Sequence, residues 1–304
     1  MAVKVKRFED LMMNDSLKPL LERAELLLNR LEHFFPPAPS SPDWENVRAC
    51  RWRKRQQYGE LQAVYHPHDI RLADLQGIDA QKALINRNTQ QFIRHCPANN
   101  VLLWGSRGTG KSSLIKALLN EYATQGLRLI EVDKQDLIDL PDIVDNLYNR
   151  SERFIIFSDD LSFEKEDASY KALKSVLDGS ISAPPRNVLI YATSNRRHLL
   201  PEYMKENLEA TYTPEGEIHQ GEAVEEKISL SERFGLWLSF YPFNQDEYLA
   251  IVRYWLVQLG ATDLENPEMR KMALQWALTR GSRSGRSAWQ FARDWAGQQG
   301  IIEK

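Results

Sequence analysis

The sequence predicts an α/β fold in which a parallel sheet is flanked by helices. Three short apolar runs, at residues 101–104, 154–157 and 188–195, have the length and composition of buried strands. Segments with apolar residues at helical spacing separate these runs, as expected for parallel strands joined by helical crossovers. The chain is wholly helical in pattern over 244–304. We therefore expect an α/β domain followed by a C-terminal helical lid.

Length, composition and charge exclude several classes of protein. The 304 residues leave room for about two domains, and an apolar fraction of 42 % is ordinary for a globular chain. A net charge of −3 gives no global sign of a nucleic-acid or anionic-membrane partner. The two cysteines, Cys50 and Cys96, have no ligand-like spacing, which fits a reducing compartment. Without a signal peptide or a membrane-spanning run, we expect a cytoplasmic protein with no membrane partner.

Residues 1–69 are expected to form an N-terminal helical extension. Apolar residues recur at helical spacing over 10–35, and a proline-rich linker follows at 35–42. The segment 43–64 also has a helical pattern. It contains five basic residues within 48–55, interleaved with tryptophan, so DNA could bind there. A solvated surface, or one that meets an acidic neighbouring subunit, explains the same charge and is the interpretation we favour.

The rest of the chain divides into two expected domains. Residues 70–243 form the α/β domain and residues 244–304 form the lid. Within the first, residues 202–228 carry eight glutamates against two lysines and contain several turn signals. We expect an exposed acidic insertion there, built as a hairpin. The lid helices are expected at 245–259, 267–280 and 284–297.

A glycine-rich loop follows the first apolar run. Residues 105–112 match the phosphate-loop pattern G-x-x-x-x-G-K-[ST], and a helical segment comes next. Its glycines allow backbone N–H groups to turn inward around a phosphate, near the positive end of that helix. The pattern predicts that Lys111 meets the β- and γ-phosphates of ATP and that Ser112 binds Mg²⁺. The residues expected to contact the nucleotide are Gly105, Ser106, Arg107, Gly108, Thr109, Gly110, Lys111, Ser112 and Ser113.

Polar side chains end the next two predicted strands. Asp159 and Asp160 follow one of them, and Asn195 ends the other. Open α/β sheets bind ligands beyond the carboxyl ends of their strands. We therefore expect Asp159 to hold Mg²⁺ and Asp160 to orient or deprotonate the attacking water, with Asn195 holding that water or a γ-phosphate oxygen. An acidic loop and a turn asparagine are the alternative interpretations.

The order of these motifs over residues 70–300 resembles the AAA+ ATPases. The segments most similar to a bacterial family of predicted AAA+ ATPases of unknown function are 72–77, 157–163, 191–197 and 226–235. Helicase-loader and transposition-helper ATPases are more distant likenesses. The resemblance implies an enzyme that uses ATP and Mg²⁺, forms a nucleotide-dependent homo-oligomer and acts on an unknown protein client.

The resemblance also assigns roles to residues of the nucleotide site. Residues 105–112 would be the Walker A loop, Asp159 the Walker B magnesium acid and Asn195 sensor 1. AAA+ proteins usually carry glutamate where this chain has Asp160, which is one methylene shorter. Slow hydrolysis, with ATP acting as a switch, is one consequence of that difference.

Four further residues take their expected roles from the resemblance. Arg286, at the start of the last helix, would be sensor 2 and reach the γ-phosphate from the lid. Arg233 would be an arginine finger that serves the nucleotide of a neighbouring subunit. Leu75 and Gly77 belong to a segment that would line the adenine pocket.

Three functions are compatible with the sequence. The first is an AAA+-type ATPase that oligomerises to complete its active site and remodels or loads an unknown partner. The second is an ATP-gated loader or adaptor with slow hydrolysis, acting on protein or DNA. The third is a small-molecule kinase, although the Arg233-Phe234 pair and the strand ending in Asn195 favour a self-assembling ATPase.

Overall fold

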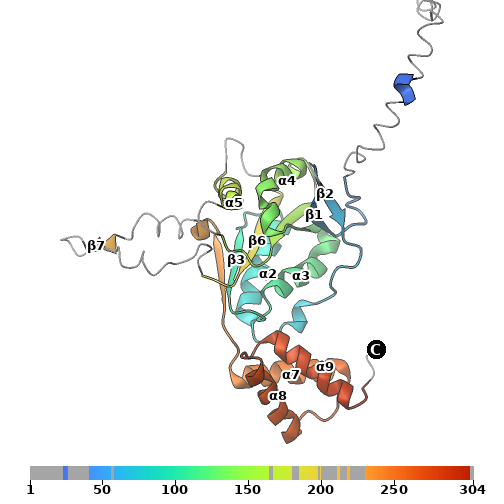
Figure 1. Cartoon of the computed structure of the whole chain (residues 1–304), viewed down its shortest axis with the longest axis vertical. Helices are drawn as coiled ribbons and strands as arrows, with labels where there is room; N and C mark the ends of the chain where they lie inside the picture. Colours follow the sequence, from blue (N-terminus) through green and yellow to red (C-terminus); the bar gives the residue numbers. More distant parts are fainter. Residues whose placement is uncertain are drawn as a thin grey trace, which may run out of the picture. The chain divides into compact units, whose positions relative to one another are not determined.

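The computed structural model describes two compact units of the chain, Met1–Ser41 and Pro42–Lys304. The residues it describes are 23–26, 41–55, 58–163, 167–179, 185–197, 199, 211–212, 218–219 and 230–301. In the first unit residues 23–26 are helical, and the rest of the helix predicted over 10–35 lies outside the described residues. The second unit contains the sheet, its flanking helices and the helical lid (Figure 1).

A seven-stranded sheet runs through the second unit in the order β2-β1-β4-β5-β6-β3-β9. Its strands are β1 (Ala49–Arg55), β2 (Tyr58–Ala63), β3 (Val101–Gly105), β4 (Leu127–Glu131), β5 (Arg153–Ser158), β6 (Val188–Ser194) and β9 (Leu236–Phe240). Neighbouring strands pair in parallel, except β1 and β2, which form an antiparallel hairpin. The predicted α/β fold with a parallel sheet is therefore confirmed.

Helices cover both faces of the sheet. The flanking helices are α2 (Asp79–Ile93), α3 (Lys111–Tyr122), α4 (Leu140–Leu147) and α5 (Ala168–Asp178). Along β5, Ile155 belongs to the core cluster that contains Leu118 of α3, whereas Ile156 belongs to the cluster that contains Ile143 of α4. All six residues of β5 are buried, as expected for a parallel strand covered on both faces.

The prediction of a helix over residues 43–64 is wrong, because this segment contains the β1–β2 hairpin. Its apolar residues alternate with basic ones at a period of two, so Cys50 and Trp52 are buried while Arg51 and Arg53 are partly exposed. Gly59 leaves the space that the Trp52 ring fills on the neighbouring strand. The sheet therefore begins at β1, well before the boundary expected at residue 70.

Three basic residues of this hairpin are paired with acids of the same chain. Because β1 lies beside β4, its side chains reach acids at the end of β4 and in the segment after it. The ion pairs are Arg51–Glu131 at 2.7 Å, Arg53–Asp133 at 3.1 Å and Lys54–Asp139 at 3.0 Å. Each is partly exposed and contributes no more than about 1 kcal/mol. The charge run in the sequence therefore has an intramolecular explanation.

Three helices form the lid, within one residue of the predicted bounds. They are α7 (Gln245–Leu259), α8 (Pro267–Thr279) and α9 (Gly285–Gln298). Asn244, Asn266 and Ser284 precede them, and each side chain accepts a hydrogen bond from a backbone N–H of the first turn. Tyr248 and Phe291 are fully buried between these helices. Capping and burial together explain why the helical pattern of the sequence was sufficient here.

Most of the predicted acidic insertion lies outside the described residues. Within it, β7 (Thr211–Tyr212) and β8 (Ile218–His219) pair in antiparallel fashion, so the hairpin is confirmed for these four residues. In the part of the chain that the structure describes, no helix is both long and apolar enough to cross a bilayer.

Replacing Gly59 by alanine should destabilise the sheet edge, since an added Cβ would overlap the Trp52 ring. Displacing that ring would also break its Nε1 hydrogen bond to Asp139. We expect the free energy of unfolding to fall by about 1–3 kcal/mol, measured by denaturant titration. Gly297→Ala is the control, because nothing lies within 4 Å of a Cβ placed there. Equal stability of the two variants would contradict this packing.

Candidate functional site

The phosphate loop connects β3 to α3 through backbone angles that favour glycine. Gly105, Gly108 and Gly110 have φ angles of +123°, +73° and +100°. At Gly105 there is no room for a side chain either, because a Cβ would overlap the carbonyl oxygen of Phe240 on β9. The Ser106 N–H donates a hydrogen bond to that oxygen at 2.9 Å. The loop is thereby fixed at the carboxyl edge of the sheet, as the sequence predicts.

The Lys111 side chain is hydrogen-bonded to the backbone of this loop. Its Nζ donates to the carbonyl oxygens of Gly105 and Ser106, both at 2.7 Å, and lies 3.4 Å from Asn195 Oδ1. Burial lowers the pKa of the Lys111 ammonium, and the nearby carboxylates of Asp159 and Asp160 oppose this effect. An anion bound in the loop would add negative charge beside this buried ammonium group and favour its charged form.

The acids after β5 meet the first turn of α3. Ser112 Oγ donates to Asp159 Oδ1 at 2.6 Å. Asn195 Nδ2 donates to Asp160 Oδ1, and Arg107 Nη2 lies 3.9 Å from Asp160 Oδ2. The side chains of the phosphate loop, of the two acids after β5 and of Asn195 after β6 therefore form one cluster. Both carboxylate oxygens of Asp160 have a partner within it.

Asp160 has a left-handed backbone, with a φ angle of +54°. Aspartate and asparagine adopt this conformation several times more often than other residues with a side chain. The backbone therefore gives a physical reason for aspartate at a position where the proteins that the sequence resembles usually carry glutamate. Such outliers concentrate at functional sites, where the surrounding contacts hold them in place.

The donor set of the cluster fits a magnesium nucleotide. Magnesium prefers oxygen ligands and is usually held in nucleotide sites by one or two protein groups together with phosphates and water. Ser112 and Asp159 supply a hydroxyl and a carboxylate beside the phosphate loop. Among the described residues no group of three or more His, Cys, Asp or Glu side chains forms a metal cage. The site suits a metal that arrives with phosphate oxygens.

Segment 72–78 lies beside the phosphate loop, next to Gly110. Leu75 and Ile78 approach Gly110, at 3.7 and 3.6 Å from the position of a Cβ there. Gly77 has a φ angle of +75° and lies against Phe243, which comes just before the first lid helix. Tyr254 of α7 donates from its hydroxyl to Asp74 Oδ1 at 2.6 Å. Leu75 therefore lies beside the phosphate loop and Gly77 beside the start of the lid, and their role in an adenine pocket stays a prediction.

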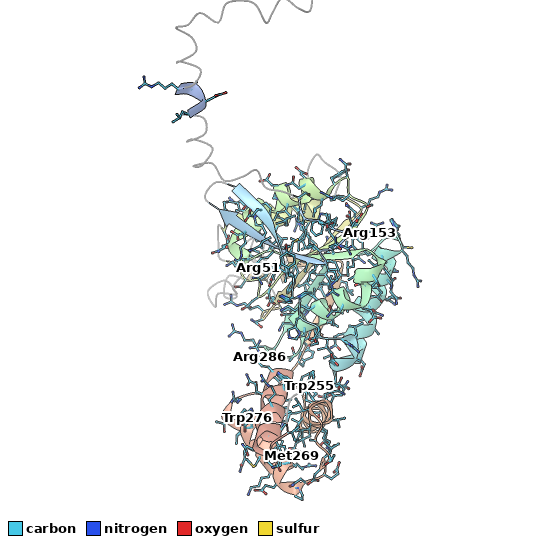
Figure 2. All side chains as sticks on the ribbon, turned by 90° about the vertical axis from the view of Figure 1, so that its right-hand side faces the viewer. Arg51, Arg153, Trp255, Met269, Trp276 and Arg286 are labelled. Atoms are coloured by element: carbon cyan, nitrogen blue, oxygen red, sulfur yellow. The ribbon has the colours of Figure 1, made fainter. Side chains whose placement is uncertain are left out.

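The start of α9 rests directly on the phosphate loop. The Arg286 N–H donates to the Gly108 carbonyl at 3.2 Å, and a Cβ at Gly108 would come within 2.9 Å of Ser284 Oγ. Figure 2 shows Arg286 at the end of the lid nearest the α/β domain. Its guanidinium is close enough to Lys111 to lower the lysine pKa further. The structure thus brings Arg286 to the site from the lid, as expected.

Arg233 has a hydrogen-bond partner outside this cluster. Its Nε donates a hydrogen bond to Asp178, the last residue of α5. The other predicted residues are brought together within the chain, whereas Arg233 is held on the segment that precedes β9. This location leaves its predicted role, in the site of a neighbouring subunit, as a proposal.

Thr193 is a site residue that the sequence analysis missed. It lies two residues before Asn195 on β6, is 1 % exposed, and contacts both acids. Successive residues of a strand point to opposite faces, so residues 193 and 195 would share a face in the strand that the sequence analysis expected over 188–195. That periodicity was the available signal, but a threonine within an apolar strand is also a common core residue.

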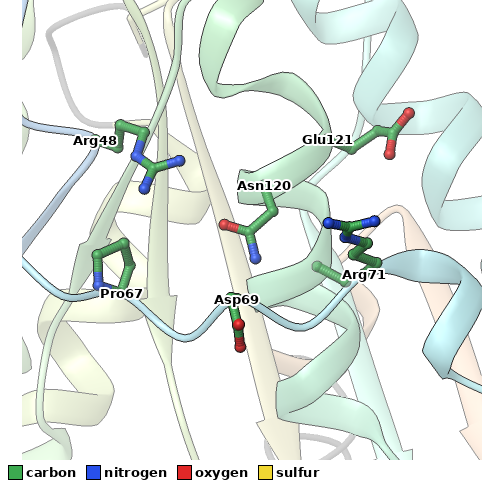
Figure 3. A pocket seen from close by; sticks show the side chains of 7 residues that line it. Arg48, Pro67, Asp69, Arg71, Asn120 and Glu121 are labelled. Atoms are coloured by element: carbon green, nitrogen blue, oxygen red, sulfur yellow. The ribbon is translucent and has the colours of Figure 1, made fainter. Parts of the chain in front are cut away.

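A separate recess of about 330 Å³ lies at the opposite end of α3 (Figure 3). Arg48 and Arg71 line it from two sides, together with Asp69 and Glu121. Between them, Asn120 Nδ2 donates to the carbonyl oxygens of residues 68 and 70, each at 2.8 Å. The amide therefore anchors the segment that leads into residues 72–78. The two arginines and the two acids give the recess no net charge.

Comparisons with known proteins agree with this architecture. A family model described as "Protein of unknown function (DUF815)" matches residues 45–299. No curated protein shows significant sequence similarity to the chain. The match begins before β1 and extends through α9, so it includes the hairpin, the sheet and the lid.

Solved structures share the fold at low sequence identity. A single-substitution variant of Thermotoga maritima RuvB has a TM-score of 0.51 and 16 % identity, over 76 % of this chain and 68 % of that one. RuvB titled as a Holliday junction branch migration motor gives 0.49 and 16 %, over 77 % and 68 %. Trip13 in an E. coli MS115-1 HORMA:CdnC:Trip13 complex gives 0.46 and 14 %, over 73 % and 90 %. The α/β domain and lid therefore share the fold of RuvB.

Replacing Gly108 by alanine should separate the lid from the phosphate loop. The buried Ser284 that a Cβ would meet cannot move freely, because it caps α9 through hydrogen bonds with Ser287. Gly281→Ala is the matched control, since Gly281 also has a positive φ of +70° but nothing within 4 Å.

The control should lose about 1–2 kcal/mol of unfolding free energy from backbone strain alone. We expect Gly108→Ala to lose more than this, in denaturant titrations followed by tryptophan fluorescence. Equal losses would mean that the lid does not press on the loop.

Proposed function

Because the chain belongs to the DUF815 family of proteins of unknown function, we propose its activity from the site itself: magnesium-dependent hydrolysis of ATP by an AAA+-type ATPase. One observation carries the proposal. A hydrogen-bonded cluster at the carboxyl edge of the sheet joins Lys111, Asn195 and Asp160, and Ser112 donates to Asp159 beside them. A phosphate loop without function would not need its lysine directed at the asparagine after β6 and its hydroxyl at the acid after β5.

The proposed binding roles follow from charge and hydrogen-bonding capacity. Lys111 and the backbone N–H groups of residues 105–112 bind the β- and γ-phosphates. Ser112 and Asp159 hold Mg²⁺, which when bound neutralises phosphate charge and polarises the bond that breaks. Leu75 and Gly77 contact the adenine, and Arg286 reaches the γ-phosphate from the lid.

Asp160 and Asn195 are proposed to orient the attacking water. A carboxylate and an amide that already contact each other can accept from and donate to one water molecule between them and the phosphate. Arg107, which lies 3.9 Å from Asp160, carries a charge that a γ-phosphate would attract more strongly than one carboxylate does. Phosphate binding would then release one oxygen of Asp160 for the water.

We further propose that the active site is completed between subunits of a homo-oligomer in the cytoplasm. Arg233 supplies positive charge to the nucleotide of the neighbouring subunit, and fingers of this kind are worth about 10³–10⁵ in rate. The exposed free thiol of Cys96 fits a reducing compartment. The output is remodelling or loading of a protein partner.

Phosphate release should depend on protein concentration. With MgATP in excess we expect the specific activity of the wild type to rise and then saturate as subunits assemble. Lys111→Ala should be inactive, and Arg233→Ala should lose about 10³-fold or more at saturation.

Mixing these two variants should restore activity, because each Arg233→Ala subunit keeps an intact pocket beside a Lys111→Ala neighbour that supplies the finger. Arg286→Ala mixed with Lys111→Ala is the control without rescue, since both changes fall in pockets rather than in fingers. Rescue absent from the first mixture would show that Arg233 does not act on the nucleotide of a neighbouring subunit. A flat specific activity with nucleotide still bound would favour the second candidate below.

A second candidate is an ATP-gated loader or adaptor with slow hydrolysis. The observation that favours it is the state of Asp160, whose two oxygens contact Asn195 and Arg107. A shorter acid that is already engaged suits a site in which bound ATP persists and holds one conformation. The partner of such a switch could be a protein or DNA.

For a DNA partner, the basic segment 48–55 is not expected to supply the contacts. Arg51 and Arg53 already pair with Glu131 and Asp133. We expect the double variant Arg51→Ala/Arg53→Ala to leave DNA binding unchanged within about twofold, in fluorescence-anisotropy titrations with MgATP over a series of salt concentrations. A marked loss, with a shallower salt dependence than the wild type, would show instead that these arginines exchange their partners for phosphates.

A further inference from the structure

We propose that Thr193 is a positioning residue that fixes both acids of the site through a single hydroxyl group, an inference that rests on the proposed ATPase function. Thr193 is the sixth of the seven residues of β6 and is 1 % exposed. Its Oγ1 lies between the backbone of Asp160 and the carboxylate of Asp159. No other described side chain contacts both acids by hydrogen bonds.

The direction of each hydrogen bond follows from the groups themselves. The Asp160 N–H can only donate, so Thr193 Oγ1 is its acceptor, at 2.9 Å. The single hydroxyl proton of Thr193 is then available for the Asp159 carboxylate, which accepts it at Oδ1. The chain of bonds therefore runs from Asp160 through Thr193 to Asp159. Only a side chain that both accepts and donates at one atom can complete it.

The first of these bonds holds the unusual backbone of Asp160. A φ angle of +54° is uncommon for a residue with a side chain, so the surrounding contacts must maintain it. The N–H of Asp160 is anchored by Thr193, and its Oδ1 is anchored by Asn195. Thr193 belongs to β6, in the middle of the sheet, and Asn195 is the residue directly after that strand. The orientation of Asp160 is thus set by the neighbouring strand.

The second bond orients Asp159 toward the metal position. Thr193 and Ser112 both donate to Oδ1 of Asp159. Within the described part of the chain no group is hydrogen-bonded to the other oxygen, Oδ2, which is left to coordinate a cation or to accept a hydrogen bond from its water. Second-sphere partners of this kind typically alter metal affinity or activity by about 10–100-fold when removed.

Thr193→Val tests the proposal, because valine keeps the shape of threonine and loses the hydroxyl. We expect the Mg²⁺ concentration for half-maximal binding of a fluorescent ATP analogue to rise about 10-fold, and kcat for phosphate release to fall about 10–100-fold. Thr193→Ser restores the hydroxyl and should return both values to within a few fold of the wild type. Thr193→Cys, a weak donor and acceptor, should lie between them and remains informative if the valine variant does not fold.

Ser194→Ala is the matched control for a purely structural role. Ser194 is the adjacent residue of β6, is fully buried, and its hydroxyl donates to the Leu161 carbonyl at 2.8 Å without contacting either acid. Its loss should lower thermal stability and leave the Mg²⁺ requirement unchanged.

Two results would overturn the proposal about Thr193 and leave the proposed function in place. If the wild type is active, an unchanged Mg²⁺ requirement in the valine or cysteine variant would rule out the positioning role of Thr193 but not the proposed ATPase function. An equal shift in Ser194→Ala would show that any buried hydroxyl of β6 has this effect. A wild type that neither binds nor hydrolyses MgATP would remove the proposed function, and this inference with it.

Discussion

The carboxylate of Asp159 is the contact on which the arrangement of the site depends. It accepts hydrogen bonds from Ser112 on α3 and Thr193 on β6, so three elements far apart in the sequence converge on one oxygen atom. The parallel sheet makes this convergence possible, because the carboxyl ends of β3, β5 and β6 lie at one edge. Burial of β5 on both faces then keeps Asp159 at a fixed depth beside the phosphate loop.

The lid is connected to this site through the loop itself. Arg286 and Ser284 meet Gly108, while Phe243 and Tyr254 meet the segment that contains Gly77. A ligand that changed the spacing between the phosphate loop and segment 72–78 would therefore move the contacts of the lid at two places. Such a connection is what an ATP-dependent machine or switch requires, and it explains why glycine is needed where the lid presses closest.

Long-range charge pairing accounts for the main error of sequence-based prediction. The basic run at 48–55 and its tryptophans have a pattern compatible with an exposed helix, yet the segment pairs with β4 and its charges meet acids more than 75 residues away. Local propensity could not indicate this, because the stabilising partners belong to a different part of the chain. Thr193 was overlooked for the same reason, since its importance comes from the acids that follow β5.

The sequence alone determined the phosphate loop, the succession of parallel strands and helices, the three lid helices and the acids at the strand ends. These features depend on contiguous residues: glycine backbone angles, helical periodicity, capping and buried apolar runs. Tertiary structure decided that β1 and β2 extend the sheet, that Asp160 has a left-handed backbone, and that Thr193 connects the two acids. Each of these is a contact between distant segments, and its energy exists only once the parallel sheet has brought them together.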